Sequence, residues 1–244
     1  MSNGKRKLPA RRSEIDQFLA KVKATPRAVQ DGQGRLLFGL DATMSRQPLW
    51  DQASQLHAEM FLETAKNGDL HVQLAYYRGL LDFRYTNWVK DPHGLIGLMT
   101  SIQCQAGRTQ IGRLFQHVLS EARRHKVNAA VFVGDAVEED ERTLYKLAGQ
   151  LGMLKTPLFI FQEGYDPEAQ QVFSKTAQLS GGACCRFDEG SVSQLRQLLG
   201  AVAKYARGGY RALRHYAERQ GNTPEGKKAL ELIRQLPAPG GQNR

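Results

Sequence analysis

The sequence contains only three cysteines among 244 residues, and two of them, Cys184 and Cys185, are adjacent. Such a set does not build the disulfide framework that staples small secreted domains. No stretch approaches the roughly 20 apolar residues that a membrane-spanning helix needs. The first residues are charged and lack the apolar segment of a secretory signal. These absences predict a globular, cytoplasmic protein with no membrane partner.

Several common catalytic and cofactor-binding motifs are also missing. There is no P-loop, no G-x-G-x-x-G after a predicted strand and no G-x-S-x-G. The six histidines are scattered without the spacing of metal ligands, and no further cysteine or histidine lies beside Cys184-Cys185 in the sequence. The sequence therefore argues against the usual nucleotide-binding, serine-hydrolase and zinc sites.

The net charge of +10 is concentrated at the two ends of the chain. Residues 1–30 carry eight Lys and Arg against two acids, and residues 200–244 carry nine against three. The centre is thus slightly acidic. Basic ends attract nucleic acid, acidic partners or anionic surfaces, and they also serve solubility.

Apolar patterns alternate between strand and helix along the centre of the chain. This alternation predicts an α/β fold: a doubly wound, mostly parallel sheet with one antiparallel edge strand and short flanking helices. We expect a basic N-terminal helix and linker over residues 1–34, the main domain over 35–207, and basic helices with a mobile tail over 208–244. The expected strands are 36–40, 70–77, 80–89, 128–133, 157–162 and 183–187, and the expected helices of the domain are 48–66, 94–105, 109–125, 141–154, 167–179 and 191–206.

Acidic and hydroxyl side chains follow two of the predicted strands. Asp41 comes directly after strand 36–40, and Asp135 follows strand 128–133. In open α/β sheets, ligands bind where loops leave the carboxyl ends of strands. In an extended loop Asp41, Thr43 and Ser45 point the same way. An all-oxygen set of this kind suits Mg²⁺ or Mn²⁺.

These residues resemble the metal-ion-dependent adhesion site (MIDAS) of the von Willebrand factor A (VWA) domain family. That site begins with Asp-x-Ser/Thr-x-Ser after the first strand, matched by Asp41, Thr43 and Ser45. A threonine from a Gly-rich loop follows, matched by Thr109 in Ala106–Gly112, and an aspartate after the fourth strand, matched by Asp135. The resemblance covers roughly residues 35–207. Two departures are Ala136, where glycine is usual, and Thr43, the rarer first hydroxyl.

The resemblance implies a binding protein rather than an enzyme. In the family, the cation accepts an Asp or Glu side chain from a partner protein. Intracellular bacterial members are often paired with AAA+ ATPases of the MoxR type, so such an ATPase is the partner that the resemblance suggests. The acidic run Glu138–Glu141 beyond Asp135 is expected either to attract cations or to favour a helix N-terminus.

Two alternatives stay open at this stage. A Mg²⁺-dependent aspartyl-phosphate phosphohydrolase would use Asp41 as nucleophile, with Thr100 or Ser101 and Lys155 as its other groups, but Thr43 stands where its general acid belongs. An RNA- or DNA-binding protein would use the basic ends, where Arg207, Arg211, Arg214 and Arg219 accompany tyrosines suited to stacking.

Overall fold

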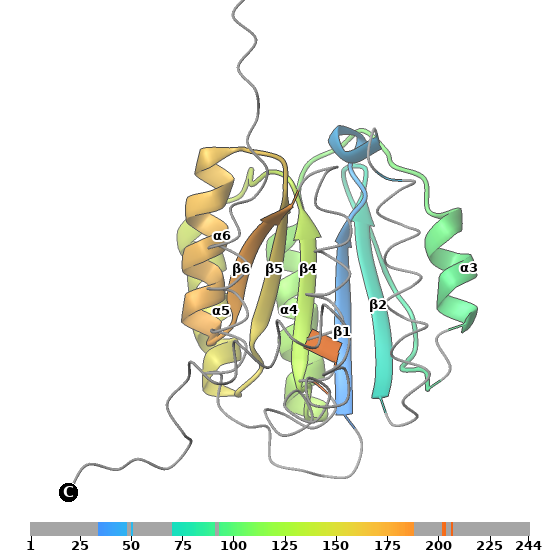
Figure 1. Cartoon of the computed structure of the whole chain (residues 1–244), viewed down its shortest axis with the longest axis vertical. Coiled ribbons are helices and arrows are strands. Elements are labelled where there is room, and N and C mark those ends of the chain that lie inside the picture. Colours follow the sequence, from blue (N-terminus) through green and yellow to red (C-terminus); the bar gives the residue numbers. More distant parts are fainter. Residues whose placement is uncertain are drawn as a thin grey trace, which may run out of the picture.

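A computed structural model describes residues 34–47, 50, 70–90, 93–187, 202, 203 and 206 of the chain (Figure 1). No helix within this described part is long and apolar enough to cross a membrane. Its elements, in chain order, are β1 (Gly34–Asp41), η1 (Met44–Arg46), β2 (Leu70–Arg78), β3 (Asp82–Tyr85), α3 (His93–Ser101), α4 (Ile111–Arg124), β4 (Ala129–Gly134), α5 (Glu141–Met153), β5 (Leu158–Glu163), α6 (Pro167–Ser180) and β6 (Ala183–Phe187).

The strands form one six-stranded sheet in the order β3-β2-β1-β4-β5-β6. All neighbouring strands run parallel except β2 and β3, which form an antiparallel hairpin at one edge. The predicted α/β fold with one antiparallel edge strand is therefore confirmed. From β1 the chain adds β2 and β3 toward one edge of the sheet, and from β4 it adds β5 and β6 toward the other edge.

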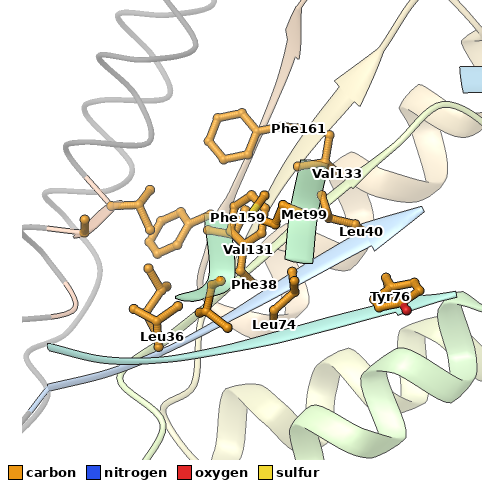
Figure 2. Packing of buried hydrophobic residues seen from close by; sticks show 14 of the residues in the cluster. Leu36, Phe38, Leu40, Leu74, Tyr76, Met99, Val131, Val133, Phe159 and Phe161 are labelled. Atoms are coloured by element: carbon orange, nitrogen blue, oxygen red, sulfur yellow. The ribbon is translucent and has the colours of Figure 1, made fainter. Parts of the chain in front are cut away.

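The first core lies on one face of the sheet (Figure 2). Neighbouring strands align apolar side chains across this face, because Phe38 pairs in register with both Leu74 and Val131, and Val131 pairs with Phe159. Met99 of α3 packs against the same cluster, as do the buried residues Trp50, Val202, Ala203 and Ala206. Strands buried on both faces need such near-continuous apolar runs.

The second core lies on the opposite face and contains the alternate residues of the same strands. Leu37 pairs with Ala130, and Phe132 pairs with Ile160. Helices α4, α5 and α6 cover this face with apolar side chains at helical spacing. In α4 the buried apolar side chains are Ile111, Leu114, Phe115, Val118 and Leu119.

Some predicted boundaries were wrong near the hairpin. The second hairpin strand spans only Asp82–Tyr85 rather than 80–89, because residues 79–81 form the turn. Gly79 adopts a positive φ of 58°, and the exposed Leu80 and Leu81 belong to the turn. The predicted helix 94–105 ends at Ser101, since Gln105 bonds instead to the loop after β1. The predicted helix 109–125 begins two residues late, at Ile111.

Several predictions concern residues outside the described part of the chain. These are most of the N-terminal segment 1–34, the helix 48–66 except Trp50, the greater part of helix 191–206, and the C-terminal segment 208–244. The division of the chain into these segments stays a prediction.

The connections that follow β1 and β4 leave the sheet toward opposite faces. After β1 the chain passes to the face that buries Trp50, whereas after β4 it passes to the opposite face through α5. Neighbouring strands whose connections leave in opposite directions form the topological switch point at which α/β sheets bind ligands. Asp41 and Asp135 lie at this point.

Substitution of two glycines by alanine should change the free energy of unfolding in opposite directions. A Cβ on Gly182 would lie 1.9 Å from the backbone oxygen of Leu158, whereas a Cβ on Gly149, within α5, meets no atom within 4 Å. Gly182→Ala should therefore lower the free energy of unfolding by about 1–3 kcal/mol. Gly149→Ala should raise it by about 0.5–1 kcal/mol. Urea denaturation measures both, and equal effects would contradict this account of the packing.

Candidate metal centre

Asp41, the last residue of β1, is completely buried. Its Oδ1 accepts a hydrogen bond from the backbone N–H of Thr43 at 2.8 Å. Its Oδ2 accepts one from the hydroxyl of Tyr77 at 2.9 Å, and Tyr77 lies opposite Asp41 in the β1–β2 register. The carboxylate is therefore held in one orientation from two sides.

Thr43 follows Asp41 in extended backbone, but Ser45 lies in the short 3₁₀ helix η1 and not in the extended loop that the sequence predicts. The backbone of Ala42 bonds to Tyr77 on one side and to Gln105 on the other. The hydroxyl oxygens of Thr43 and Ser45 lie 3.2 Å apart. Thr43 is buried and Ser45 is exposed, so these hydroxyls extend from the protein interior to its surface.

Asp135 follows β4 directly, at the neighbouring strand end. Its charge raises the pKa of Asp41, so the two carboxylates lie within electrostatic reach of each other. Gly134, which precedes Asp135, leaves room for the ring of Phe132, since a Cβ there would lie 2.7 Å from Cζ of that ring. Oδ1 of Asp135 is buried, yet it accepts no hydrogen bond from the part of the chain that the structure describes. A buried acceptor without a partner is costly and calls for an explanation.

Thr109 lies in the loop before α4. A Cβ on Gly107 would lie 1.9 Å from the backbone oxygen of Gly79, so only glycine allows this loop to pack against the hairpin turn. The Thr109 hydroxyl donates to Oε2 of Glu139 at 2.5 Å and accepts from the backbone N–H of Glu138 at 3.1 Å.

The five predicted ligands thus occupy two adjoining groups. Asp41, Thr43 and Ser45 form the first group through direct hydrogen bonds. Asp135 acts electrostatically on Asp41, and Thr109 bonds to Glu138 and Glu139 in the loop that carries Asp135. The described residues contain no group of three or more His, Cys, Asp or Glu side chains suited to a metal. That the five oxygen-bearing side chains bind one cation together stays a prediction.

Arg46 was not foreseen as part of the site, yet it is completely buried beneath it. Its Nε and Nη2 both lie 2.8 Å from Oε2 of Glu163, the last residue of β5. Its Nη1 donates to the backbone oxygen of Asp41. The guanidinium also lies 5.2 Å from the ring centroid of Trp50. Arg46 therefore connects the ends of β1 and β5.

Burial dominates the acid–base properties of the centre. It raises the pKa values of the Asp41, Glu139 and Glu163 carboxyls, although hydrogen bonds and Arg46 partly oppose the shift. Burial and the Asp41 charge also place the pKa of Tyr77 well above its usual value, so the phenol stays a hydrogen-bond donor. The buried thiol of Cys104 nearby has a pKa raised to about 11, again mainly by desolvation.

The charges near the carboxyl ends of β1, β4 and β5 are unbalanced among the described residues. Asp41, Asp135 and Glu163 act on one another, and Arg46 is the cation that acts on Asp41 and Glu163. Carboxylates that repel each other in a desolvated site favour either protonation or a bound cation.

Arg46, Tyr77 and Glu163 were not predicted from the sequence as members of this centre, and Glu139 was named only as part of the acidic run Glu138–Glu141. Tyr77 and Glu163 carry a weak signal, since both stand at or next to the end of a predicted strand. Arg46 directly follows Ser45, but arginine is rarely buried, so a sequence alone places it at the surface. The position of Glu139 depends on contacts between loops that are distant in sequence.

Neither a family model nor a curated protein matches the sequence. Solved structures do resemble it. A von Willebrand factor type A structure from Catenulispora acidiphila aligns with a TM-score of 0.59 and 13% identity, covering 71% of this chain and 43% of that one. The SpRpn10 VWA domain aligns with a TM-score of 0.50 and 13% identity, covering 73% and 97%. The chain has the fold of a VWA domain.

Two further solved structures resemble the chain to a similar degree. An aerotolerance-related membrane protein from Bacteroides fragilis aligns with a TM-score of 0.51 and 14% identity, covering 68% of this chain and 98% of that one. The human COPII-coat protein Sec24c aligns with a TM-score of 0.51 and 11% identity, covering 72% and 32%. This chain spans less than half the length of the Catenulispora and Sec24c structures.

Removing the charge of Asp41 should stabilise the metal-free protein. Because the folded-state pKa of Asp41 is raised, its ionised form opposes folding at neutral pH, and this penalty disappears as the pH falls through that pKa. Asp41→Asn keeps acceptors and donors for Thr43 and Tyr77. In a chelator we expect the variant to unfold at higher urea concentration than wild type at pH 7, with the difference shrinking toward pH 4. A variant that is less stable at every pH would contradict this.

Removing the charge of Glu163 should have the opposite effect, although burial raises its pKa too. The reason is that its carboxylate pairs directly with the Arg46 guanidinium, whereas Asp41 bonds to Arg46 through its backbone oxygen. Glu163→Gln leaves the buried Arg46 guanidinium without its counter-charge, which should cost about 3–5 kcal/mol of unfolding free energy. Glu168→Gln makes the same change at an exposed position in the first turn of α6 and serves as the control. Equal stability of the two variants in urea denaturation would show that the ion pair is not needed.

Proposed function

We propose that the chain is a metal-dependent protein-binding adaptor. Asp41, Thr43, Ser45, Thr109 and Asp135 hold one Mg²⁺ or Mn²⁺, and the cation binds an Asp or Glu side chain of a partner protein. The observation that carries this proposal is the buried Oδ1 of Asp135, which lacks a hydrogen-bond partner in the described structure while lying beside a second carboxylate. A bound cation satisfies both groups at once.

The chemistry of the side chains supports a hard cation. Carboxylates and hydroxyls are the ligands that Mg²⁺ and Mn²⁺ prefer, whereas Zn²⁺ prefers sulfur and imidazole nitrogen. A divalent cation also offsets the repulsion between Asp41 and Asp135. When bound, it would supply a positive centre for an anionic ligand.

The same set of ligands favours docking over catalysis. Three of the five side chains are neutral hydroxyls, which donate weakly and leave the cation attractive to one more anionic oxygen. Met44 and Ser45 are exposed directly after Thr43, so a group from outside can approach this end of β1.

The phosphohydrolase alternative gains little from the geometry. It needs a lysine near Asp41, but Lys155 precedes β5 and therefore lies at the amino-terminal end of the parallel strands, whereas Asp41 lies at their carboxyl end. The hydroxyls of Thr100 and Ser101 bond to carbonyls of their own helix. The nucleic-acid alternative depends on the basic ends, which lie outside the described residues, and it stays a prediction.

The surroundings of the site indicate what the partner presents. Leu80 and Leu81, exposed by 69% and 82%, lie in the turn that packs against the Thr109 loop. Arg108 in that loop is also exposed. An acidic residue flanked by apolar side chains would suit this edge. A MoxR-type AAA+ ATPase is a candidate because of the family resemblance, and the neighbours Rpn10 and the COPII-coat protein Sec24c share the fold.

Isothermal titration with Mg²⁺ and Mn²⁺ tests the proposal directly. We expect wild type to bind one cation, and Asp41→Ala and Asp135→Ala to lose detectable binding, because each variant removes one of two carboxylates. Asp82→Ala is the control, since Asp82 pairs with Arg78 and Arg84 in the hairpin and should be dispensable for binding.

Two results would contradict the proposal. Absence of cation binding by wild type would exclude the metal site. Turnover of a phosphomonoester that is abolished by Asp41→Asn would favour the phosphohydrolase instead.

A further inference from the structure

Glu139 occupies an unusual position for a residue of the loop between β4 and α5. Its side chain does not cap its own helix, because Asp140 accepts the N–H of Thr143 there. Oε1 of Glu139 instead accepts the backbone N–H of Gly112 at 2.8 Å, in the first turn of α4. The N-cap residue of α4, Gln110, makes no side-chain capping bond. Glu139 thus supplies from outside the acceptor that the free N–H groups of a helix start require.

The second oxygen of Glu139 governs the hydroxyl of Thr109. A hydroxyl has one proton to donate and two lone pairs to accept with. The proton of Thr109 goes to Oε2 of Glu139, and one lone pair accepts the backbone N–H of Glu138. One lone pair is left. These two bonds determine its direction, because together they prevent the hydroxyl from rotating.

The contacts of Glu138 strengthen the same link. Its carboxylate accepts the backbone N–H of Thr109 at 2.8 Å, while its own N–H donates to the Thr109 hydroxyl. The loop that carries Asp135 and the loop that carries Thr109 are therefore joined by a reciprocal pair of bonds, to which Glu139 adds two more. The relative position of these two predicted ligands depends on this set of bonds.

We infer that Glu139 is a positioning residue of the metal site: it accepts the proton of Thr109 and thereby aims the free lone pair of that hydroxyl at the cation. This inference rests on the proposed function. It differs from a role in which the Glu139 charge merely attracts cations, and from a role in which Glu139 only stabilises α4. Groups that orient metal ligands typically contribute 10–100-fold to metal affinity.

A double-mutant cycle separates these roles. Mn²⁺ binding is measured by electron paramagnetic resonance of the free ion for wild type, Glu139→Gln, Thr109→Ala and the double variant. A glutamine side chain has one acceptor oxygen and cannot serve both Thr109 and Gly112, so we expect the dissociation constant of Glu139→Gln to rise at least about 10-fold. In the Thr109→Ala background the same substitution should change it by less than about twofold, because the hydroxyl it acts through is gone.

Two further variants complete the test. Glu141→Gln makes the same charge change two residues further on, where the carboxylate accepts a bond from Tyr145, and it should leave Mn²⁺ affinity within about twofold of wild type. Glu139→Asp keeps the charge but is too short to reach both partners, so it should bind as weakly as Glu139→Gln. Thermal unfolding of each metal-free variant shows whether it folds. If Glu139→Gln does not fold, Glu139→Asp replaces it in the test.

The outcomes are distinct. No Mn²⁺ binding by wild type overturns the proposed function and this inference with it. Normal binding by wild type, together with an equal loss on Glu139→Gln with and without Thr109, shows that Glu139 acts through its charge and overturns the inference alone. Wild-type affinity for Mn²⁺ in Glu139→Asp or in Glu139→Gln also overturns the inference alone.

Discussion

The carboxylate of Asp41, buried at the end of the central strand, is the constraint on which the rest of the site depends. An ionised group in that position needs partners on every side. The Thr43 amide and the Tyr77 hydroxyl occupy its two oxygens, and Arg46 bonds to its backbone and moderates its charge. Arg46 in turn needs Glu163, so one buried acid accounts for a network that reaches from β2 to β5.

The fold was predictable from the sequence because its signals are local and repeated. Strands such as Ala129–Gly134 are buried on both faces and read as short apolar runs, while helices such as Pro167–Ser180 have a capping aspartate before them and glycine after them. The prediction failed at the hairpin, where Leu80 and Leu81 have strand-like side chains. The turn prevailed there because Gly79 has a positive φ and Arg113 binds the Leu81 carbonyl.

The site was predictable only in part. Asp41, Thr43 and Ser45 are close in sequence and therefore close in space, although Ser45 lies in the 3₁₀ helix η1 and not in the extended loop that the sequence predicts. The position of Asp135 follows from the order of parallel strands. The contacts of Glu139 with Gly112 and of Glu163 with Arg46 could not be foreseen, because the partners are 27 and 117 residues apart in the sequence. The acidic run Glu138–Glu141 illustrates the difference. Asp140 caps its own helix, α5, as expected for such acids, but Glu138 and Glu139 accept backbone N–H groups of Thr109 and Gly112 at the start of α4.

The position of Trp50 gives the molecule an optical property. Its indole N–H bonds to the carbonyl of Ile102, and its ring lies beneath the Arg46 guanidinium that touches Asp41. The chain's other tryptophan, Trp88, bonds to Glu121 of α4 and lies in the other core. Indole emission is sensitive to nearby charge, so any event that displaces Arg46 changes the fluorescence of a single residue, without a label.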